Sequence, residues 1–523
     1  MTQNPDFSFT ALMFIPSDSD HQKQVKTNIW DKLLSGGAGS QLQWTGAGNP
    51  EHTPKWFTGQ WIPFENDDDL AGVLAKAFSS CKTTHLLFIN NYNLVMTINQ
   101  SVLDLIQLSL KRSPNAGLVY GDYDLIGNSG ITPVRLLKHH TGRVRDNQDY
   151  GRLFCFNVSA IQKAGGVNRG LQFHPLYDLL LKISEQNELV HIANKFLGSL
   201  YSVTAPKQDV NVFDYLMEEK GNQLEAEEIA TEHLQRIGAY LAPGDYFQKR
   251  PQPMHNPDLK ASIIIPVNQR PEFIGTALES CLQQTEQDIE VIVVVNGGAE
   301  DSTIPEIKRY QQGGDKYREN APRVQFIVVD INNIGFCLNN GVSIAKGEFY
   351  VQLDSDDRLK QNAIERILEV FESDPEIGIV IGSYDVWELK KDGTLIRKKE
   401  IPTVTHDEWT RKNGRNNLLR VGGAGAPRSI PIQLIKDIGL FGMNEEPYSR
   451  NYAEDYELVT RISEHYQVGR IFEPIYDVIR HPGGTDHSID QNTIDRNDET
   501  KDWIRKIALK RRIKLNRSQN EPI

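Results

Sequence analysis

Three carboxylates stand within four positions, at Asp354, Asp356 and Asp357, directly after the β-forming run 349–353. Like charges this close repel one another and raise one another's pKa, so stability alone does not explain them. A divalent cation neutralises such a cluster most simply, and hard carboxylate oxygens suit Mn²⁺ or Mg²⁺. The carboxyl end of a strand in an open α/β sheet is also where ligands bind. A solvated acidic turn or a helix N-cap would use the same residues, so the rest of the chain must decide.

A second acidic pair, Glu454-Asp455, opens a predicted helix that continues to Ile462. Acids in a first turn stabilise a helix through its dipole, and the functional alternative makes one of them a general base. Farther along, His481 and His487 lie in a Gly-rich loop. Either histidine is a structural side chain or a contact to a metal or a phosphate.

Two other strand ends can form a nucleotide pocket. The strand-like runs are 260–267 and 289–295, and the second ends at Asn296-Gly297-Gly298. The amide of Asn296 can pair with the edge of a base, and glycines let the backbone approach a ligand closely. An ordinary turn is the alternative for this tripeptide.

Strands and helices alternate around these groups. Further strands of the second half are predicted at 324–329, 349–353 and 378–381, with helices such as 271–284 between them. The first half alternates in the same way, with strands at 9–16, 85–89 and 116–120 and helices at 70–78 and 101–111. This alternation predicts an α/β fold with mostly parallel, Rossmann-type sheets.

The two halves echo each other at an offset of roughly 260 residues, which indicates an internal duplication. They differ where chemistry would take place. Asn90-Asn91-Tyr92-Asn93 stands in place of the acidic cluster, and Tyr177 stands in place of Glu454. Amides supply no negative charge to a divalent cation, so the first copy is expected to be free of metal.

Composition and patterning bound the remaining choices. The chain has 523 residues and a net charge of −12, which disfavours nucleic-acid binding. No apolar run reaches the length of a membrane span, no secretory signal is recognised, and four scattered cysteines without a CxxC fit a reducing cytoplasm. The expected domains are a degenerate α/β domain (1–215), a helical linker (216–257), a second α/β domain (258–495) and a basic tail (496–523).

The tail is the most basic part of the chain. Residues 501–517 hold eight Lys or Arg and one acid, Asp502, a local charge of +7. If the segment is helical, Trp503, Ile504 and Ile507 share one side, as in a helix that lies on an anionic membrane surface. A solvated tail and a helix docked on the protein itself are the alternatives.

Five motifs in the second half occur in a recognisable order. They are Ser262–Val267, Val293–Gly298, Asn339–Gly341 with Ala345–Glu348, Asp354–Asp357, and Glu454-Asp455. In this order they resemble family 2 glycosyltransferases of the GT-A fold. The first half resembles the degenerate GT-A-like region that precedes the active domain in enzymes of bacterial surface-polysaccharide assembly.

The resemblance implies a role for each site residue. Asp455 would be the catalytic base, and Asp356, Asp354 and His481 (or His487) would contact the divalent metal. The nucleotide-sugar would be bound by Pro266, Val267, Asn268, Asn296, Gly297, Asp354, Ser355 and Glu454. Val295 and Leu338 depart from residues frequent in the family, which leaves the identity of the donor open.

The resemblance also implies a reaction. An inverting enzyme would move a sugar from a nucleotide-diphosphate sugar, UDP- or dTDP-linked, to a saccharide or lipid-linked acceptor in polysaccharide or O-antigen synthesis. The enzyme would be cytoplasmic, with peripheral membrane contact through its tail. A non-catalytic sugar- or protein-binding scaffold of the same fold is the alternative. A nucleotidyltransferase is disfavoured, because residues 268–271 lack a Gly-rich phosphate loop.

Overall fold

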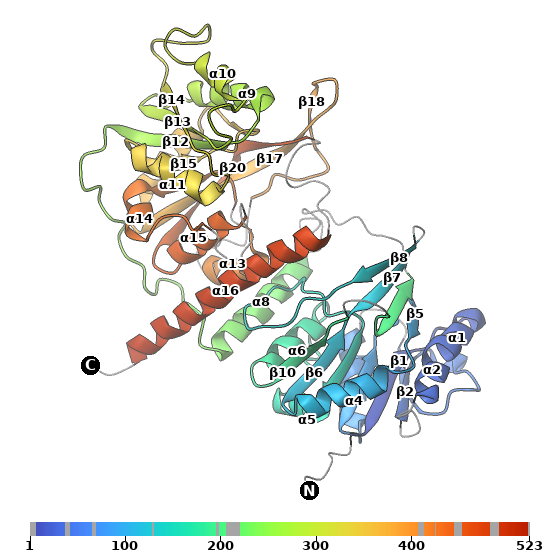
Figure 1. The fold of residues 1–523 in the computed structure, drawn as a ribbon. Helices are drawn as coiled ribbons and strands as arrows, with labels where there is room; N and C mark the ends of the chain where they lie inside the picture. Colours follow the sequence, from blue (N-terminus) through green and yellow to red (C-terminus); the bar gives the residue numbers. More distant parts are fainter. Residues whose placement is uncertain are drawn as a thin grey trace. The chain divides into compact units, whose positions relative to one another are not determined.

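The computed structural model divides the chain into two compact units, Met1–Ile237 and Gly238–Ile523, which we describe separately (Figure 1). It describes residues 7–36, 42–64, 69–127, 130–194, 198–204, 220–405, 413–423, 425–443, 452–481 and 491–520. His487 therefore lies outside the described residues. No helix within these ranges is both long enough and apolar enough to cross a membrane.

The first unit is built on a seven-stranded sheet in the order β10-β6-β9-β4-β1-β2-β3. Its strands are β1 (Phe9–Phe14), β2 (Leu42–Gly48), β3 (Gln60–Pro63), β4 (His85–Ile89), β6 (Ala116–Gly121), β9 (Leu153–Asn157) and β10 (Glu188–Ile192). Only β9 is antiparallel to its neighbours in this sheet. A smaller sheet pairs β5 (Val95–Ile98), β11 (Tyr201–Thr204), β7 (Tyr123–Gly127) and β8 (Gly130–Val134).

Helices and apolar side chains cover both faces of this large sheet. The helices are α1 (Ser19–Val25), α2 (Asp31–Ser35), α3 (Leu70–Ser80), α4 (Val102–Arg112), α5 (Val158–Lys163), α6 (Pro175–Ser184) and α8 (Lys220–Arg236). Alternate residues of β1 point to opposite faces, so Ala11 and Met13 join one core cluster while Leu12 and Phe14 join the other. The predicted helices 70–78 and 101–111 are confirmed as α3 and α4.

The predicted linker does not form a unit of its own. Helix α8 belongs to the first unit, where His233 contacts Glu185 with 2.8 Å between Nδ1 and Oε1. Residues 238–257 belong to the second unit.

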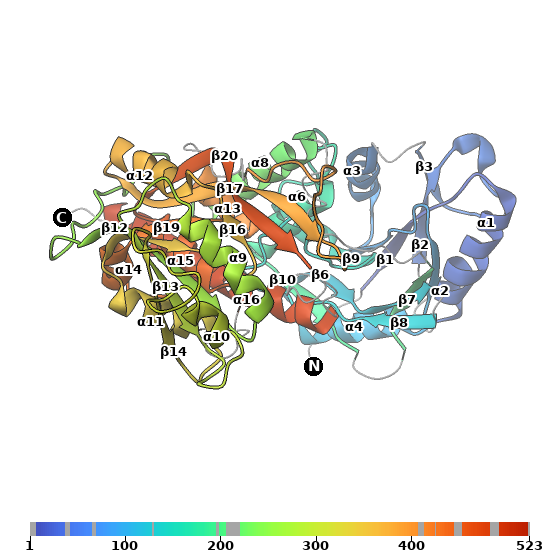
Figure 2. The same ribbon diagram turned by 90° about the horizontal axis from the view of Figure 1, so that it is seen from above.

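The second unit contains a large sheet in the order β14-β13-β12-β15-β19-β17-β20-β16, with β18 paired to β17. Its strands are β12 (Leu259–Val267), β13 (Ile289–Val295), β14 (Arg323–Val328), β15 (Gly347–Gln352), β16 (Arg358–Leu359), β17 (Ile377–Leu389), β18 (Leu395–Arg397), β19 (Arg428–Pro431) and β20 (Gln467–Arg480). The long strands β17 and β20 run side by side and parallel (Figure 2). From β12 the chain proceeds outward to β13 and β14 and then returns to β15 on the other side. The carboxyl ends of β12 and β15 therefore meet at a topological switch point, where open α/β sheets bind ligands.

The two large sheets share one topology. In each unit the strands are counted in chain order, from β1 in the first and from β12 in the second, leaving out β5, β7, β8, β11, β16 and β18. Both sheets then have the order 3-2-1-4-6-5-7. In both, the sixth strand is antiparallel to its neighbours. Strand β4 thus corresponds to β15. The amino end of α6 corresponds to that of α15 (Glu454–Ile462), the helix that begins with the second acidic pair. The mostly parallel α/β fold is confirmed, while a transferase origin for the first unit stays a prediction.

The helices of the second unit include the acidic helix and the basic segment. They are α9 (Pro271–Leu282), α10 (Ile304–Lys308), α11 (Ile334–Ile344), α12 (Ala363–Ser373), α13 (Gly414–Val421), α14 (Ile432–Asp437), α15 (Glu454–Ile462) and α16 (Gln491–Asn520). Helix α16 crosses beside α13 and α15 (Figure 1). Its Arg512 is fully buried and donates to the carbonyl of Arg415 at 2.8 Å. The basic segment is therefore a helix docked on the protein, one of the two alternatives to a membrane-bound helix.

Candidate active site

The loops after β12 and β13 are joined to each other by hydrogen bonds. The Asn296 N–H donates to the carbonyl of Val267 at 2.8 Å, and the Asn268 side chain donates to the carbonyl of Asn296 at 3.2 Å. Pro266 is half-buried and Val267 is buried. The predicted nucleotide-binding residues of the two strands therefore lie together at the switch point.

The amide of Asn296 differs from the expected orientation toward a base. The side chain is 7% exposed, and its Nδ2 lies 3.3 Å from Sγ of Cys337. Its Oδ1 is buried without a hydrogen-bond partner among the described residues. The amide is thus packed inside the protein, which leaves one acceptor unsatisfied next to the proposed base pocket.

Asp301 organises this loop, and the sequence analysis did not identify it. It is 2% exposed and accepts from the N–H of Gln269 at 3.0 Å and that of Thr303 at 2.8 Å. A Cβ added to Gly297 would lie 2.1 Å from Oδ2 of Asp301, so this position has no room for a side chain. The sequence analysis attributed the glycine at position 297 to the close approach of a ligand. The Asp301 carboxylate also requires a residue without a side chain there.

The three acids of the central cluster have different environments. Asp356 is 24% exposed at its side chain and contacts His481, with 2.9 Å between Oδ2 and Nε2, while Arg270 lies 4.0 Å away. Asp354 lies on the other side, where Gln352 donates to its Oδ1 at 3.3 Å. Burial raises the pKa of the Asp354 carboxyl, and the charge of Asp356 adds to this.

Asp357 faces inward and serves the fold. Its two oxygens accept from the hydroxyl of Tyr476 at 2.9 Å and from the N–H of Ile479 at 2.8 Å. These bonds hold the end of β20 beside the cluster and bring His481 next to Asp356. Ser355, between Asp354 and Asp356 in the sequence, is also buried. The acidic run therefore combines two carboxylates at the switch point with one that anchors a strand.

The residues fit a divalent cation that is held partly by its substrate. Within the described ranges, no three His, Cys, Asp or Glu side chains are grouped closely enough to form a ready-made metal site. Mg²⁺ and related ions usually take one or two carboxylates and complete their shell with water and substrate phosphates. Asp354, Asp356 and His481 supply that kind of donor set.

Helix α15 presents the second acidic pair at the same edge of the sheet. Glu454 is 4% exposed, and burial together with the charge of Asp455 raises the pKa of its carboxyl to about 8. Asp455 is more open, with 24% of its side chain exposed, and its Oδ1 accepts from the N–H of Tyr456 at 2.6 Å. Of the pair, Asp455 is the more exposed carboxylate, and its role as the base stays a prediction.

Arg428, at the start of β19, lies between the two acidic groups, and the sequence analysis did not identify it. Its NH1 is 3.1 Å from Oδ2 of Asp455, and its Nε donates to Oε1 of Gln352 at 3.4 Å. Burial alone would lower the pKa of this guanidinium, but the carboxylates of Asp455 and Asp354 raise it. The signal that could have revealed it is electrostatic, because several buried acids at one strand edge require a cation.

Helix α16 supports α15 with further cations. The ammonium of Lys501 lies 5.1 Å from the ring centre of Tyr452, and the guanidinium of Arg505 lies 5.4 Å from that of Tyr456. Arg505 pairs with Asp502 at 2.6 Å, and both side chains are buried. The basic helix thus carries part of the packing beneath the candidate base.

The corresponding edge of the first unit is closed by side chains. Both amide atoms of Asn91 bond to the backbone of Phe14, with Nδ2 donating at 2.9 Å and Oδ1 accepting at 2.8 Å. The rings of Phe14, Phe64 and Tyr92 pack beside it at centroid distances of 4.9 to 5.3 Å. Asp178, which corresponds to Asp455, is buried and pairs with Lys182 at 2.7 Å.

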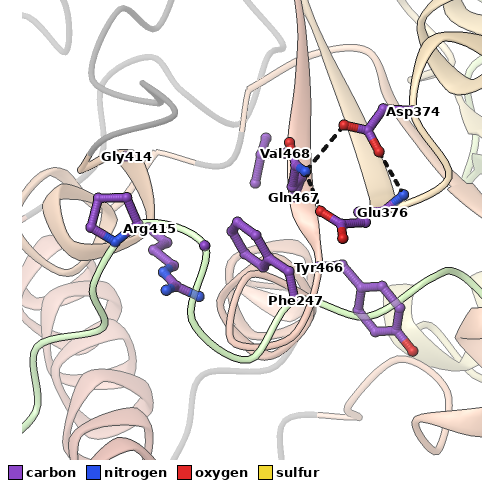
Figure 3. Close-up of a pocket in the computed structure, with 10 residues that line it drawn as sticks. Phe247, Asp374, Glu376, Gly414, Arg415, Tyr466, Gln467 and Val468 are labelled. Carbon is purple, nitrogen blue, oxygen red and sulfur yellow. Dashed lines mark hydrogen bonds between the residues drawn. The ribbon is translucent and has the colours of Figure 1, made fainter.

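A cavity of about 430 Å³ in the second unit lies elsewhere (Figure 3). It is lined by Phe247, Arg415 and Tyr466 and by Asp374 and Glu376, which both accept from Gln467. These residues stand where β17 and β20 begin, whereas the acids stand at the carboxyl ends of parallel strands. The cavity is therefore separate from the candidate active site.

Comparison with known proteins connects this geometry to a family. Residues 262–425 match the model of glycosyl transferase family 2, which confirms the resemblance over that range. A chondroitin synthase of Escherichia coli is 30% identical over 155 residues, 29% of this chain and 21% of the relative. A hyaluronan synthase of Pasteurella multocida is 34% identical over 135 residues, 26% of this chain and 13% of the relative. An uncharacterised glycosyltransferase of Rickettsia typhi is 31% identical over 38% of this chain and 56% of the relative. The chain therefore spans about half or less of each of these relatives.

Solved structures give weaker likenesses. A mannosyltransferase of Pyrobaculum calidifontis, in complex with GDP-Man and Mn²⁺, is 14% identical with a TM-score of 0.33, covering 58% of this chain and 84% of that one. Residues 1–349 of S. aureus TarS, in complex with UDP-GlcNAc, are 18% identical with a TM-score of 0.33, covering 44% of this chain and 62% of that one. Likenesses at this level carry no argument about substrates.

Proposed function

We propose that the second unit is an inverting glycosyltransferase that uses a nucleotide-diphosphate sugar. The observation that carries this is positional: the region matched by the family model ends the strands β12, β13 and β15 with Pro266, Asn296 and Asp354 at one edge of the sheet. Relatives named as chondroitin and hyaluronan synthases support a role in polysaccharide synthesis. The donor is expected to be UDP- or dTDP-linked, and the acceptor a saccharide or a lipid-linked saccharide.

The residues divide the chemistry between them. A divalent cation held by Asp354 and Asp356 would supply electrostatic stabilisation of the leaving diphosphate. Asp455 accepts the proton of the acceptor hydroxyl as that oxygen attacks the anomeric carbon. Because one base and a direct displacement suffice, the anomeric configuration inverts. Glu454, whose carboxyl pKa is raised by burial and by the charge of Asp455, would contact the donor sugar.

Donor screening tests the proposal directly. The full chain is incubated with UDP-, dTDP- and GDP-sugars, with Mn²⁺ or Mg²⁺, and with mono- and oligosaccharide acceptors, while nucleoside diphosphate release is measured. We expect release from one nucleotide class that depends on both the cation and an acceptor. Tight nucleotide-sugar binding without turnover under any of these conditions would favour the non-catalytic scaffold.

One nucleotide site per chain is expected, because Asn91 and the aromatic rings of Phe14, Phe64 and Tyr92 close the corresponding edge of the first unit. Calorimetric titration of the full chain with Mn²⁺ and the nucleotide found by screening should give a stoichiometry near one. Asp356→Ala should remove this binding. Tight Mn²⁺-dependent binding that survives the substitution would place a second site elsewhere, and the first unit would then be the place to look.

The exposed side of α16 can still contact an anionic membrane from the cytoplasmic side, and we infer a peripheral contact of electrostatic type. Ile504 and Ala508 are buried in the protein, whereas Lys510, Lys514 and Arg517 are exposed. Each basic residue near such a surface contributes about 1 kcal/mol. Deletion of the helix would remove core residues, so charge reversal is the better test.

The triple variant Lys510→Glu, Lys514→Glu and Arg517→Glu should lose co-sedimentation with anionic liposomes at low salt. The matched control reverses Lys111, Arg112 and Lys163, which are also exposed, with the same change in net charge. If the wild type does not sediment, or if both variants sediment as the wild type does, α16 is not a membrane contact.

A further inference from the structure

Arg428 connects the candidate base to the strand that carries the candidate metal ligand. On one side its NH1 contacts Asp455 on α15, and on the other its Nε bonds to Gln352 on β15, which in turn donates to Asp354. The hydroxyl of Tyr350 donates to the same Gln352 oxygen at 2.9 Å, which fixes that amide. A chain of direct contacts therefore runs from Asp455 to Asp354 through a single guanidinium.

The guanidinium is held in place independently of the acids. Its side chain is only 11% exposed, and its NH1 also donates to the carbonyl of Gly425. The following residue, Ser429, is buried and donates to the carbonyl of Tyr350 at 2.7 Å. Because β19 pairs with β15 from Ser429 onward and with β17 at Arg428 itself, the backbone of Arg428 is fixed by the sheet.

The Asp455 carboxylate is oriented by one contact at each oxygen. Oδ1 accepts from the N–H of Tyr456, and Oδ2 contacts Arg428. The first contact belongs to α15 itself and moves with the helix. Among the described residues, the second contact is the one that ties the carboxylate to the sheet, where the donor is proposed to bind.

We propose that Arg428 is the positioning residue for the general base, holding Asp455 at a fixed place relative to Asp354. This inference rests on the function proposed above. A planar guanidinium can reach two acceptors at once, whereas an ammonium is a single point charge. A displacement of about 1 Å in a catalytic group can cost about 10²-fold in rate. Arg428 therefore acts on turnover through Asp455 and leaves donor affinity unchanged.

A double-mutant cycle tests this on the full chain. Arg428→Gln should lower kcat by about 10²-fold with little change in the KM for the donor, and Arg428→Lys should recover part of the loss. In the Asp455→Asn background, adding Arg428→Gln should cost less than about threefold, because residues that act as a unit are not additive. Full additivity, or an Arg428→Gln variant with wild-type kcat, overturns the proposal.

Arg461→Gln is the matched control. Arg461 lies on α15, the helix that carries Asp455, and its side chain is 23% exposed and pairs with Glu457 at 2.9 Å. Its guanidinium contacts the carbonyls of Ile438 and Leu440 rather than Asp455. This variant should keep kcat within a few-fold of the wild type and should be additive with Asp455→Asn. If Arg461→Gln matches Arg428→Gln in both respects, Arg428 has only a structural role.

Hydrogen exchange separates this inference from the proposed function. In the full chain without substrate, Arg428→Gln should raise the rate of amide exchange in residues 454–457. Arg461→Gln should leave the exchange rate of the Glu454 amide unchanged. If no donor is ever turned over, the proposed function fails but this measurement still reports on Asp455. Unchanged exchange in Arg428→Gln would overturn the positioning role even in an active enzyme.

Discussion

Asp455→Asn is expected to lower turnover by about 10²-fold or more, the usual scale for loss of a general base, with donor binding nearly intact. Asparagine keeps the size of the side chain and an oxygen that can accept from the Tyr456 N–H, which lies 2.6 Å from Oδ1 in the native structure. It cannot take the proton of the acceptor hydroxyl. Measuring kcat and donor KM on the purified variant checks both halves of this expectation.

Glu457→Gln provides the control for Asp455→Asn. It removes a carboxylate from the same first turn of α15 without touching the Asp455 contacts, because Glu457 pairs with Arg461. Its activity should stay close to that of the wild type. A large loss of donor affinity with unchanged turnover in Asp455→Asn would make Asp455 a binding residue.

Asp356→Ala is expected to abolish transfer while the chain still folds. Asp356 is 24% exposed at its side chain, its charge raises the pKa of the Asp354 and Asp357 carboxyls, and it contacts the buried His481 and the half-buried Arg270. Removing it relieves the repulsion with Asp354 and Asp357, although the buried His481 loses its contact to Asp356. Circular dichroism and thermal unfolding should match the wild type, and excess EDTA should stop the wild-type reaction.

The neighbouring variant Asp357→Ala should destabilise the fold, in contrast to Asp356→Ala. It strips the Tyr476 hydroxyl and the Ile479 N–H of their buried acceptor, which costs about 1–3 kcal/mol of unfolding free energy. Full activity of Asp356→Ala, or wild-type activity undiminished in EDTA, would rule out the metal role.

The strands and most helices could be predicted from the sequence because their signals are local. The apolar runs 260–267 and 289–295 became β12 and β13 almost residue for residue. Long-range pairing carries no such signal, so the sequence analysis does not anticipate the antiparallel strand β19.

The candidate site shows the same limit at the level of side chains. Clustered acids after a strand are visible in the sequence, but which of them faces inward depends on β20, far along the chain, and this singles out Asp357. Arg428 could not be chosen among the many arginines, because its partners Gln352 and Asp455 come from two other elements. The burial of α16 depends likewise on surfaces that only the folded unit presents.

The second unit closes on itself, and this has a consequence for how its chain can be rearranged. Asn516, near the end of α16, donates to the carbonyls of Gly238 at 2.8 Å and Tyr240 at 2.9 Å. The first and last parts of the unit are therefore neighbours, although more than 270 positions separate them. Adjacent ends are what circular permutation requires, and the exposed turn 391–393 between β17 and β18 offers a place to open the chain. The arrangement of Asp354, Asp455 and Arg428 depends on the closed sheet and its helices, so it would survive a new order of the same segments.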